Sequence, residues 1–145
     1  MTVHIRPSRA DDLEFATALL IQAGLPVDDL AADKLAFTAE CDDTIHGLIG
    51  VERFGDTALL RSLVIAEPAR GNGVGQLLVA ALEVASADAG IVEIWLLTID
   101  ADGWFSRHGY EVRDRADAPD SIRATREFSG LCPGDAVLMS KKLGH

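Results

Sequence analysis

The chain has few cysteines and no long apolar run, so it lacks the features that build disulfide frameworks, cysteine-bound zinc sites and membrane spans. Its only two cysteines, Cys41 and Cys132, lie far apart and form no C-x-x-C pair, so neither a zinc site nor a disulfide framework is indicated. No apolar run approaches the ~20 residues needed to cross a membrane, and the N-terminus lacks the apolar core of a signal peptide. We therefore expect a reduced cytoplasmic protein without a metal ion.

Positive charge is also scarce. The 145 residues include 13 Lys and Arg but 23 Asp and Glu, which gives a net charge of −10. Such a balance disfavours nucleic acids and anionic membranes as partners. An anionic ligand would have to be held by a local arginine and not by the overall field. With 48% hydrophobic residues, the chain has the size and composition of one globular domain spanning residues 1–145.

A glycine-rich turn between an apolar strand and a helix is the strongest functional signal. The turn is Arg70-Gly71-Asn72-Gly73-Val74-Gly75, and it follows the apolar run Leu63-Val64-Ile65. Each glycine costs a helix about 1 kcal/mol relative to Ala, so helix propensity does not explain three of them. They suit a backbone that approaches a ligand closely. The first turn of a helix attracts anions and Arg pairs with phosphate, so we expect a pyrophosphate here.

Several interpretations of this turn compete. No Gly-Lys-Ser/Thr follows, so it is not a Walker A loop. A Rossmann fingerprint needs G-x-G-x-x-G, which the spacing does not match, but Glu93 lies where that fold's acidic residue is expected. A glycine-rich connection without a ligand is also open. The remaining interpretation is the motif Arg-x-x-Gly-x-Gly, which Arg70, Gly73 and Gly75 match. By this motif the chain resembles the GNAT N-acetyltransferases.

The pattern of apolar residues and turn signals predicts seven strands, at Val3–Arg6, Phe37–Cys41, Thr44–Phe54, Ala58–Ile65, Val92–Thr98, Tyr110–Asp114 and Ala136–Lys142. Helices are expected from a capping box at Ser8 and Asp11 to Gly24, over Gly73–Ala89 and over Ala101–His108, with a short helix or loop from Pro26 to Lys34. Leu77 is expected on the buried side of the main helix. The order of these predicted strands and helices along the chain matches that of GNAT proteins. The resemblance implies an α/β (three-layer α+β) fold with a mixed, mostly antiparallel sheet of about seven strands and about four helices.

The resemblance extends beyond the turn. The segment Trp104-Phe105-Ser106-Arg107-His108-Gly109-Tyr110 is similar to the aromatic pair and x-x-x-Gly-aromatic of GNAT proteins. Phe105 stands where many members have the tyrosine that reprotonates the coenzyme A thiolate, and Thr98 replaces the usual Asn. We therefore expect Phe105 to pack on the coenzyme and not to act as an acid. The resemblance implies acetyl-CoA as cosubstrate, bound by Leu63, Val64, Ile65, Arg70, Gly71, Asn72, Gly73, Val74, Gly75, Gln76, Thr98 and Phe105.

The second half resembles the acetyltransferases of arsenic-resistance operons, which are similar to amino-acid N-acetyltransferases. The resemblance is carried by Leu59-Leu60-Arg61-Ser62-Leu63-Val64 and by Pro119-Asp120-Ser121-Ile122 through Thr125, Glu127-Phe128 and Leu131-Cys132-Pro133. It implies a small amine acceptor, a glutamate-like amino acid or its arsenic- or phosphorus-containing analogue. Glu127 is a candidate substrate-binding residue, with a plain loop charge as the alternative.

The two-residue turn at Gly55-Asp56 predicts that two charged residues, Glu52 and Arg61, lie close together. A two-residue turn makes Glu52 and Arg61 diagonal neighbours on one face, with Gly50 leaving room beside Arg61. We expect Arg61 to bind the carboxylate of the acceptor, Glu52 to orient Arg61 or take the amine proton through water, and Ser62 to mark a splay in the strand. A purely structural ion pair is the equal alternative.

Three function classes stay open at this point. The first is direct N-acetyl transfer to a small acceptor. The others are a non-catalytic acetyl-CoA-binding or sensory module, which Phe105 makes credible, and acetylation of protein N-termini or lysines. A homodimer also stays open.

Overall fold

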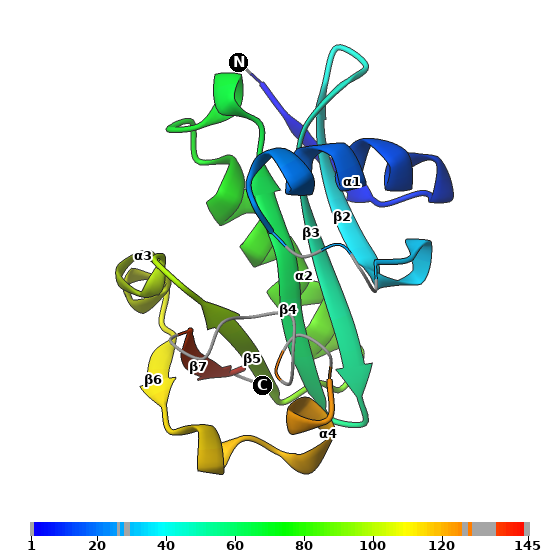
Figure 1. Ribbon diagram of the computed structural model, residues 1–145. Coiled ribbons are helices and arrows are strands. Elements are labelled where there is room, and N and C mark those ends of the chain that lie inside the picture. The colour runs from blue at the N-terminus through cyan, green and yellow to red at the C-terminus, as the bar shows by residue number, and fades with distance from the viewer. Residues whose placement is uncertain (1, 26, 28–29, 126–127, 129–135, 144–145) are drawn as a thin grey trace. The chain divides into compact units, whose positions relative to one another are not determined.

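The computed structural model describes every residue except 1, 26, 28–29, 126–127, 129–135 and 144–145. Within these residues, seven strands form one mixed sheet in the order β1-β2-β3-β4-β5-β7-β6, with four α-helices (Figure 1). The strands are β1 (His4–Pro7), β2 (Leu35–Cys41), β3 (Thr44–Phe54), β4 (Thr57–Ile65), β5 (Glu93–Thr98), β6 (Glu111–Arg113) and β7 (Val137–Lys142), and the helices are α1 (Leu13–Gln22), α2 (Val74–Asp88), α3 (Asp102–Arg107) and α4 (Asp120–Arg123). The predicted fold class is confirmed.

Strand directions separate this fold from a doubly wound one. The pairs β1–β2, β2–β3, β5–β7 and β6–β7 are antiparallel, and β4 and β5 run parallel with α2 as their connection. A Rossmann sheet is mostly parallel. The strand–turn–helix at residues 63–82 is therefore a single parallel crossover inside a mostly antiparallel sheet, and the Rossmann alternative is wrong.

Two details of the helices differ from prediction. Pro26–Lys34, predicted as a short helix or loop, has only the 3₁₀ turn η2 (Ala32–Lys34) among its described residues, so the fourth α-helix is the unpredicted α4. The predicted capping box at Ser8 and Asp11 is shifted by one residue. The Asp12 carboxylate accepts the N–H of Arg9 at 2.8 Å, and α1 follows the 3₁₀ turn η1 (Ala10–Asp12).

Both predicted hairpin turns are present, and their backbone conformations differ. Asp42 and Asp43 have φ of 52° and 62°, the two positive values of a type I′ turn between β2 and β3. In the β3–β4 turn Gly55 has φ of 62° and Asp56 is not in the positive region, as a type II′ turn requires. The second turn sets the register on which Glu52 and Arg61 depend.

The backbone contacts divide the chain into two units, of which the first contains residues 1–51 and 62–85. Its core on one face of the strands joins α1 to β2, β3 and β4 through Ala16, Leu20, Leu35, Leu48 and Val64. Figure 1 shows α1 crossing this face.

The other face of this first unit packs on α2. A Cβ on Gly47 would lie 3.0 Å from Ile65 Cδ1 and 3.2 Å from Leu78 Cδ1, so β3 approaches β4 and α2 too closely for a side chain. Leu77 is 46% exposed, and Val79 is buried instead, so the buried arc of α2 is rotated from the predicted one.

The second unit contains residues 52–61 and 86–145. Its core joins Leu59, Trp95, Ala118, Ile122 and Leu138. Leu59 of β4 faces Trp95 of β5 in the parallel register, and Phe54 and Phe128 pack against the same cluster. In this unit the segment after β6 therefore covers the sheet face that carries Leu59.

Candidate functional site

The glycine turn ends in an open backbone cradle at the start of α2. Gly71 and Gly73 have φ of 85° and 77°, a region that L-residues rarely adopt. Apart from the adjacent residues, no heavy atom of the described residues lies within 4 Å of the Cβ that either position would carry, so the space beside the backbone is open. The Gly73 carbonyl accepts the N–H of Leu77 at 3.2 Å. The helix thus begins at once, and the N–H groups of its first turn have no partner four residues earlier.

Polar side chains tie the cradle to the end of β4. The Nε of Arg70 donates to the Ile65 carbonyl at 3.2 Å, and the Asn72 amide donates to the Ala69 carbonyl at 3.2 Å. Arg70 is exposed and makes no ion pair within the described part of the chain. Open N–H groups, a helix N-terminus and one guanidinium together form an arrangement that is chemically suited to a phosphate group.

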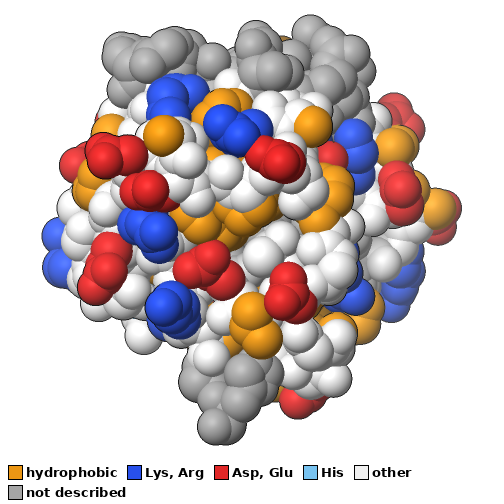
Figure 2. Space-filling model, turned by 90° about the horizontal axis from the view of Figure 1, so that it is seen from below, with side chains coloured by type: hydrophobic (Ala, Val, Ile, Leu, Met, Phe, Trp, Pro, Cys, Tyr) orange, Lys and Arg blue, Asp and Glu red, His pale blue; other side chains and the backbone are white. Residues whose placement is uncertain are grey.

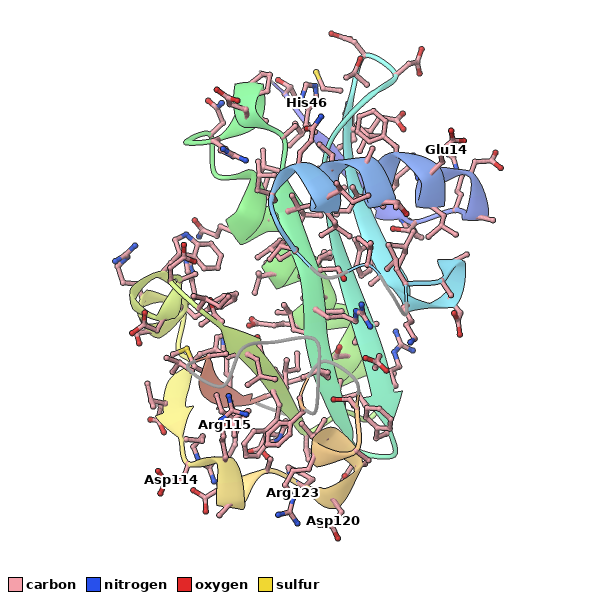
Figure 3. The ribbon with its side chains drawn as sticks, in the orientation of Figure 1. Glu14, His46, Asp114, Arg115, Asp120 and Arg123 are labelled. Carbon is pink, nitrogen blue, oxygen red and sulfur yellow. The ribbon has the colours of Figure 1, made fainter. Side chains whose placement is uncertain are left out.

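Ser62 interrupts β4 just before this cradle. Its φ is 58°, which is uncommon for a residue with a side chain. A regular hairpin from the two-residue turn would place Ile65 opposite His46, but the His46 carbonyl accepts the N–H of Ala66 at 2.8 Å. Figure 3 shows His46 near the start of β3. One extra residue is therefore accommodated in β4, as in a β-bulge. The predicted break at Ser62 is present, and a bulge frees backbone groups for a ligand.

The Arg61–Glu52 neighbourhood predicted from the turn is confirmed. Arg61 Nη1 lies 3.2 Å from Glu52 Oε2, and the two side chains are 1% and 14% exposed. The pair lies on the second unit's sheet face beside Leu59 and Phe54, two residues away along each strand. A buried guanidinium with a carboxylate partner can bind a second acid group or hold the carboxylate in place.

Thr98 and Phe105, two further predicted residues, belong to the second unit, and the predicted Gln76 is exposed in α2. The Thr98 hydroxyl accepts the N–H of Ala101 at 3.1 Å, just before α3. Phe105 is 5% exposed, and its ring meets Trp104 and Tyr110 edge-on at centroid distances of 4.9 and 5.5 Å. Glu127 lies outside the described residues.

A charged network in the first unit was missed at the sequence level. Arg6 forms two bonds to Asp12, at 2.9 and 3.0 Å, and one to Glu40 at 2.8 Å, while Thr38 donates to Asp12 at 3.0 Å. Burial raises the pKa of the Asp12 carboxyl, but the bonds from Arg6, Arg9 and Thr38 outweigh it and lower the pKa to about 2. Each donor finds a partner inside the cluster, which indicates a structural role.

Gly47 is a second residue that sequence reasoning missed. An isolated glycine inside a strand pattern signals a close backbone approach, and that signal was available. The described residues contain no group of three His, Cys, Asp or Glu able to hold a metal ion. No helix within the described ranges is long and apolar enough to cross a membrane.

The comparisons with known proteins agree with this geometry. A family model described as an acetyltransferase (GNAT) domain matches residues 32–112, which contain the glycine cradle, Ser62 and the Arg61–Glu52 pair. The chain belongs to the GNAT acetyltransferase family. Its match to the uncharacterized N-acetyltransferase CT2212 of Chlorobaculum tepidum is 35% identical over 65 residues, or 45% of this chain and 41% of that protein.

Two solved structures show that the fold itself is shared. The N-acetylglutamate synthase of Neisseria gonorrhoeae, complexed with coenzyme A and N-acetyl-glutamate, aligns with a TM-score of 0.86 and 18% identity, over all of this chain and 36% of the other. Rv2747 of Mycobacterium tuberculosis, in complex with CoA, aligns with a TM-score of 0.81 and 17% identity, over 97% and 99% of the two chains. The chain thus spans about a third of the synthase and less than half of the curated relative.

Proposed function

We propose that this GNAT chain transfers the acetyl group of acetyl-CoA directly to the amino group of a small amino-acid-like acceptor. The observation that carries the proposal is the cradle before α2, where Gly71 and Gly73 open the backbone beside Arg70. This cradle fits a pyrophosphate. The names of several relatives agree, since two structural neighbours were solved with coenzyme A and one curated relative is called an N-acetyltransferase.

In the proposed reaction the neutral amine attacks the thioester carbon. The C–N bond forms, the C–S bond breaks, and coenzyme A leaves as a thiolate. The bulge at Ser62 and the following backbone of Leu63 to Ile65 supply N–H groups for the pantetheine amides and for the oxyanion. Thr98, Gln76 and the ring of Phe105 are proposed further contacts of the coenzyme.

The Arg61–Glu52 pair is the proposed acceptor side of the reaction. Arg61 binds the acid group of the acceptor as a fork, and Glu52 takes the amine proton through a water molecule. Phe105 has no hydroxyl, so the thiolate is proposed to gain its proton from water. Glu127 is a further proposed contact of the acceptor, at a position outside the described residues.

The acceptor class rests on the resemblance to arsenic-resistance and amino-acid acetyltransferases. Glutamate-like amino acids and their arsenic- or phosphorus-containing analogues are the proposed acceptors. The neighbour whose structure contains N-acetyl-glutamate supports an acceptor with a carboxylate. A reduced, cytoplasmic enzyme fits the scarcity of cysteine.

A thiol-release assay with acetyl-CoA and a panel of acceptors tests the proposal. The panel holds glutamate, its phosphorus- and arsenic-containing analogues, neutral amino acids and an amine without a carboxylate. Release with the acids and none with the simple amine is the expected result. Phe105 favours one competing function, a module that binds acetyl-CoA without turning it over. Tight coenzyme A binding in calorimetry without thiol release on any acceptor would establish that module instead.

A further inference from the structure

A glycine inside the first unit gives a stronger signal than the charged surface does. Figure 2 shows Lys, Arg, Asp and Glu side chains next to one another on one face of the molecule, as is typical of an ordinary solvated surface. Gly47, by contrast, lies within β3 where that strand meets both the end of β4 and the helix α2. The proposed donor site is built from those same two elements, so the packing at Gly47 bears on the reaction.

Close approach, and not backbone freedom, explains this glycine. Gly47 does not have a positive φ. A Cβ there would lie 3.0 Å from Ile65 Cδ1, 3.1 Å from the Val64 carbonyl oxygen and 3.2 Å from Leu78 Cδ1, and ordinary van der Waals contact begins at 3.4 Å. The two methyl groups can adjust, but the carbonyl belongs to the backbone. An alanine would therefore move β4 by a few tenths of an ångström.

Hydrogen bonds tie the end of β4 to the same junction. The His46 carbonyl accepts the N–H of Ala66 at 2.8 Å, one residue from Gly47 in β3. Arg70 Nε donates to the Ile65 carbonyl at 3.2 Å, which joins the glycine cradle to the strand. A displacement of β4 at this point therefore reaches both the backbone that is proposed to bind the pantetheine arm and the arginine of the cradle.

Leu78 joins the junction to the first turns of α2. It is fully buried, and its neighbour Leu77 donates its N–H to the Gly73 carbonyl in the cradle. With a rise of about 1.5 Å per residue, Leu78 lies about 7.5 Å along the helix axis from Gly73. Figure 1 shows α2 running behind β3 and β4. A helix is rigid over so short a distance, so the contact between Gly47 and Leu78 sets the position of the cradle.

We infer that Gly47 is a positioning residue that sets the spacing between the two halves of the donor site. One half is the backbone of Leu63 to Ile65, which takes the pantetheine arm, and the other is the glycine cradle, which takes the pyrophosphate. Acetyl-CoA spans both halves, so its thioester is placed correctly only if the spacing between them is correct. The inference rests on the proposed function, because it places the donor along β4 and at the cradle.

The length of the donor separates this role from a purely structural one. Acetyl-pantetheine has no pyrophosphate and occupies only the β4 half, so the spacing does not affect its reaction. Acetyl-CoA uses binding energy at the cradle to place its thioester. A changed spacing therefore lowers kcat/KM for acetyl-CoA alone, whereas a loss of folded protein lowers kcat/KM for both donors by the same factor.

Steady-state kinetics of Gly47→Ala with the two donors tests the inference. The value of kcat/KM is expected to fall about tenfold for acetyl-CoA and less than about twofold for acetyl-pantetheine. Gly24→Ala is the matched control, because Gly24 has φ of 74° and a Cβ there meets no heavy atom within 4 Å beyond its chain neighbours. It strains the backbone without touching β4 or α2 and should leave the ratio of the two kcat/KM values unchanged. Equal losses with both donors in Gly47→Ala, or no loss with either, would overturn the inference.

A second variant approaches the junction from the helix. Leu78→Val removes the Cδ atoms that face Gly47 and tests the spacing even if Gly47→Ala does not fold. The ratio of kcat/KM for acetyl-CoA to that for acetyl-pantetheine is expected to fall at least about threefold in this variant. An unchanged ratio in Leu78→Val would contradict the role of the junction.

Calorimetry decides the inference if no acceptor is acetylated from either donor, an outcome that rejects the proposed function. Coenzyme A spans both halves of the site, whereas adenosine 3′-phosphate 5′-diphosphate reaches only the cradle. In Gly47→Ala the affinity for coenzyme A is expected to fall about tenfold and the affinity for the nucleotide to stay unchanged. Equal weakening of the two ligands would overturn the inference. Failure of coenzyme A to bind the native protein would reject the inference together with the proposed function.

Discussion

The glycine cradle and the Arg61–Glu52 pair are candidate sites built in opposite ways. The cradle is exposed and made of backbone, and Gly71 and Gly73 have positive φ angles that favour glycine over other residues. The pair is made of side chains, and the Arg61 side chain is only 1% exposed. A backbone site of this kind needs only a local run of residues, while a buried ion pair needs two strands in the correct register. Substitutions should therefore affect affinity at the cradle and stability at the pair.

The largest effect is expected from Glu52→Gln. The substitution removes the carboxylate beside a guanidinium that is almost fully buried, so the free energy of unfolding should fall by about 3 kcal/mol. Urea denaturation measures it. Asp120→Asn removes the acid of an ion pair whose Asp120 side chain is 94% exposed and should leave stability unchanged. Equal losses in the two variants would mean that burial does not distinguish the Arg61 pair.

Gly73→Val should give the largest loss of affinity. A branched Cβ at φ of 77° fills the open cradle, and coenzyme A binding should weaken about 100-fold in calorimetry. Gly90→Val, at φ of 88° just after α2, is the matched control, because it carries the same backbone strain and the same open surroundings. Both variants should lose stability, and only Gly73→Val should lose affinity. Unchanged affinity in folded Gly73→Val refutes the cradle as the coenzyme site.

Acid titration tests whether the Asp12 cluster, like the Arg61–Glu52 pair, contributes to the free energy of unfolding. The pKa of Asp12 is about 2 in the folded protein, against 3.8 for the ordinary group, so the unfolded chain binds more protons between these values. This contributes about 2 kcal/mol to stability at neutral pH, of which about 1 kcal/mol is lost by pH 3. Comparison of the native protein with Asp12→Asn from pH 7 to pH 3 measures it. A native slope retained in Asp12→Asn would assign the acid sensitivity to other carboxyls.

The functional role of the pair is separable from its structural role. The double variant Glu52→Gln/Arg61→Met removes both charges while keeping much of the volume, which limits the stability cost. The KM for the acceptor should rise at least about tenfold, and the affinity for coenzyme A should stay unchanged. If kcat/KM for the acceptor is the same as in the native enzyme, the pair is structural only.

The smallest effect is expected in the β2–β3 turn, where backbone conformation matters but no ligand is proposed to bind. Asp43 has φ of 62° in the type I′ turn, where glycine is favoured. Asp43→Gly should stabilise the protein by about 0.5 to 1 kcal/mol in urea denaturation and should not change either substrate's binding. A loss of stability would show that the Asp43 side chain contributes more than its backbone strain costs.

The sequence predicted those parts of the molecule that depend on neighbours along the chain. Strand β3 has the predicted ends, Thr44 and Phe54, because turn residues bound it on both sides. The glycine cradle and the Glu52–Arg61 neighbourhood also follow from short runs, one through glycine's backbone freedom and the other through a two-residue turn. These features need no information from distant residues.

Tertiary structure decided what depends on distant partners. Periodicity placed Leu77 in the core, but the arc of α2 that is buried depends on Gly47 and Leu78 meeting across the first unit. Asp12 joins Arg6 and Thr38, and Thr38 lies on another strand 26 residues away, so no local pattern marks the cluster. Local residues determine backbone conformation through steric limits, whereas burial and ion pairing are set by whichever surface packs opposite. The chain itself therefore determined the glycine cradle and the pairing of Glu52 with Arg61, and packing decided that the Arg61 side chain is buried.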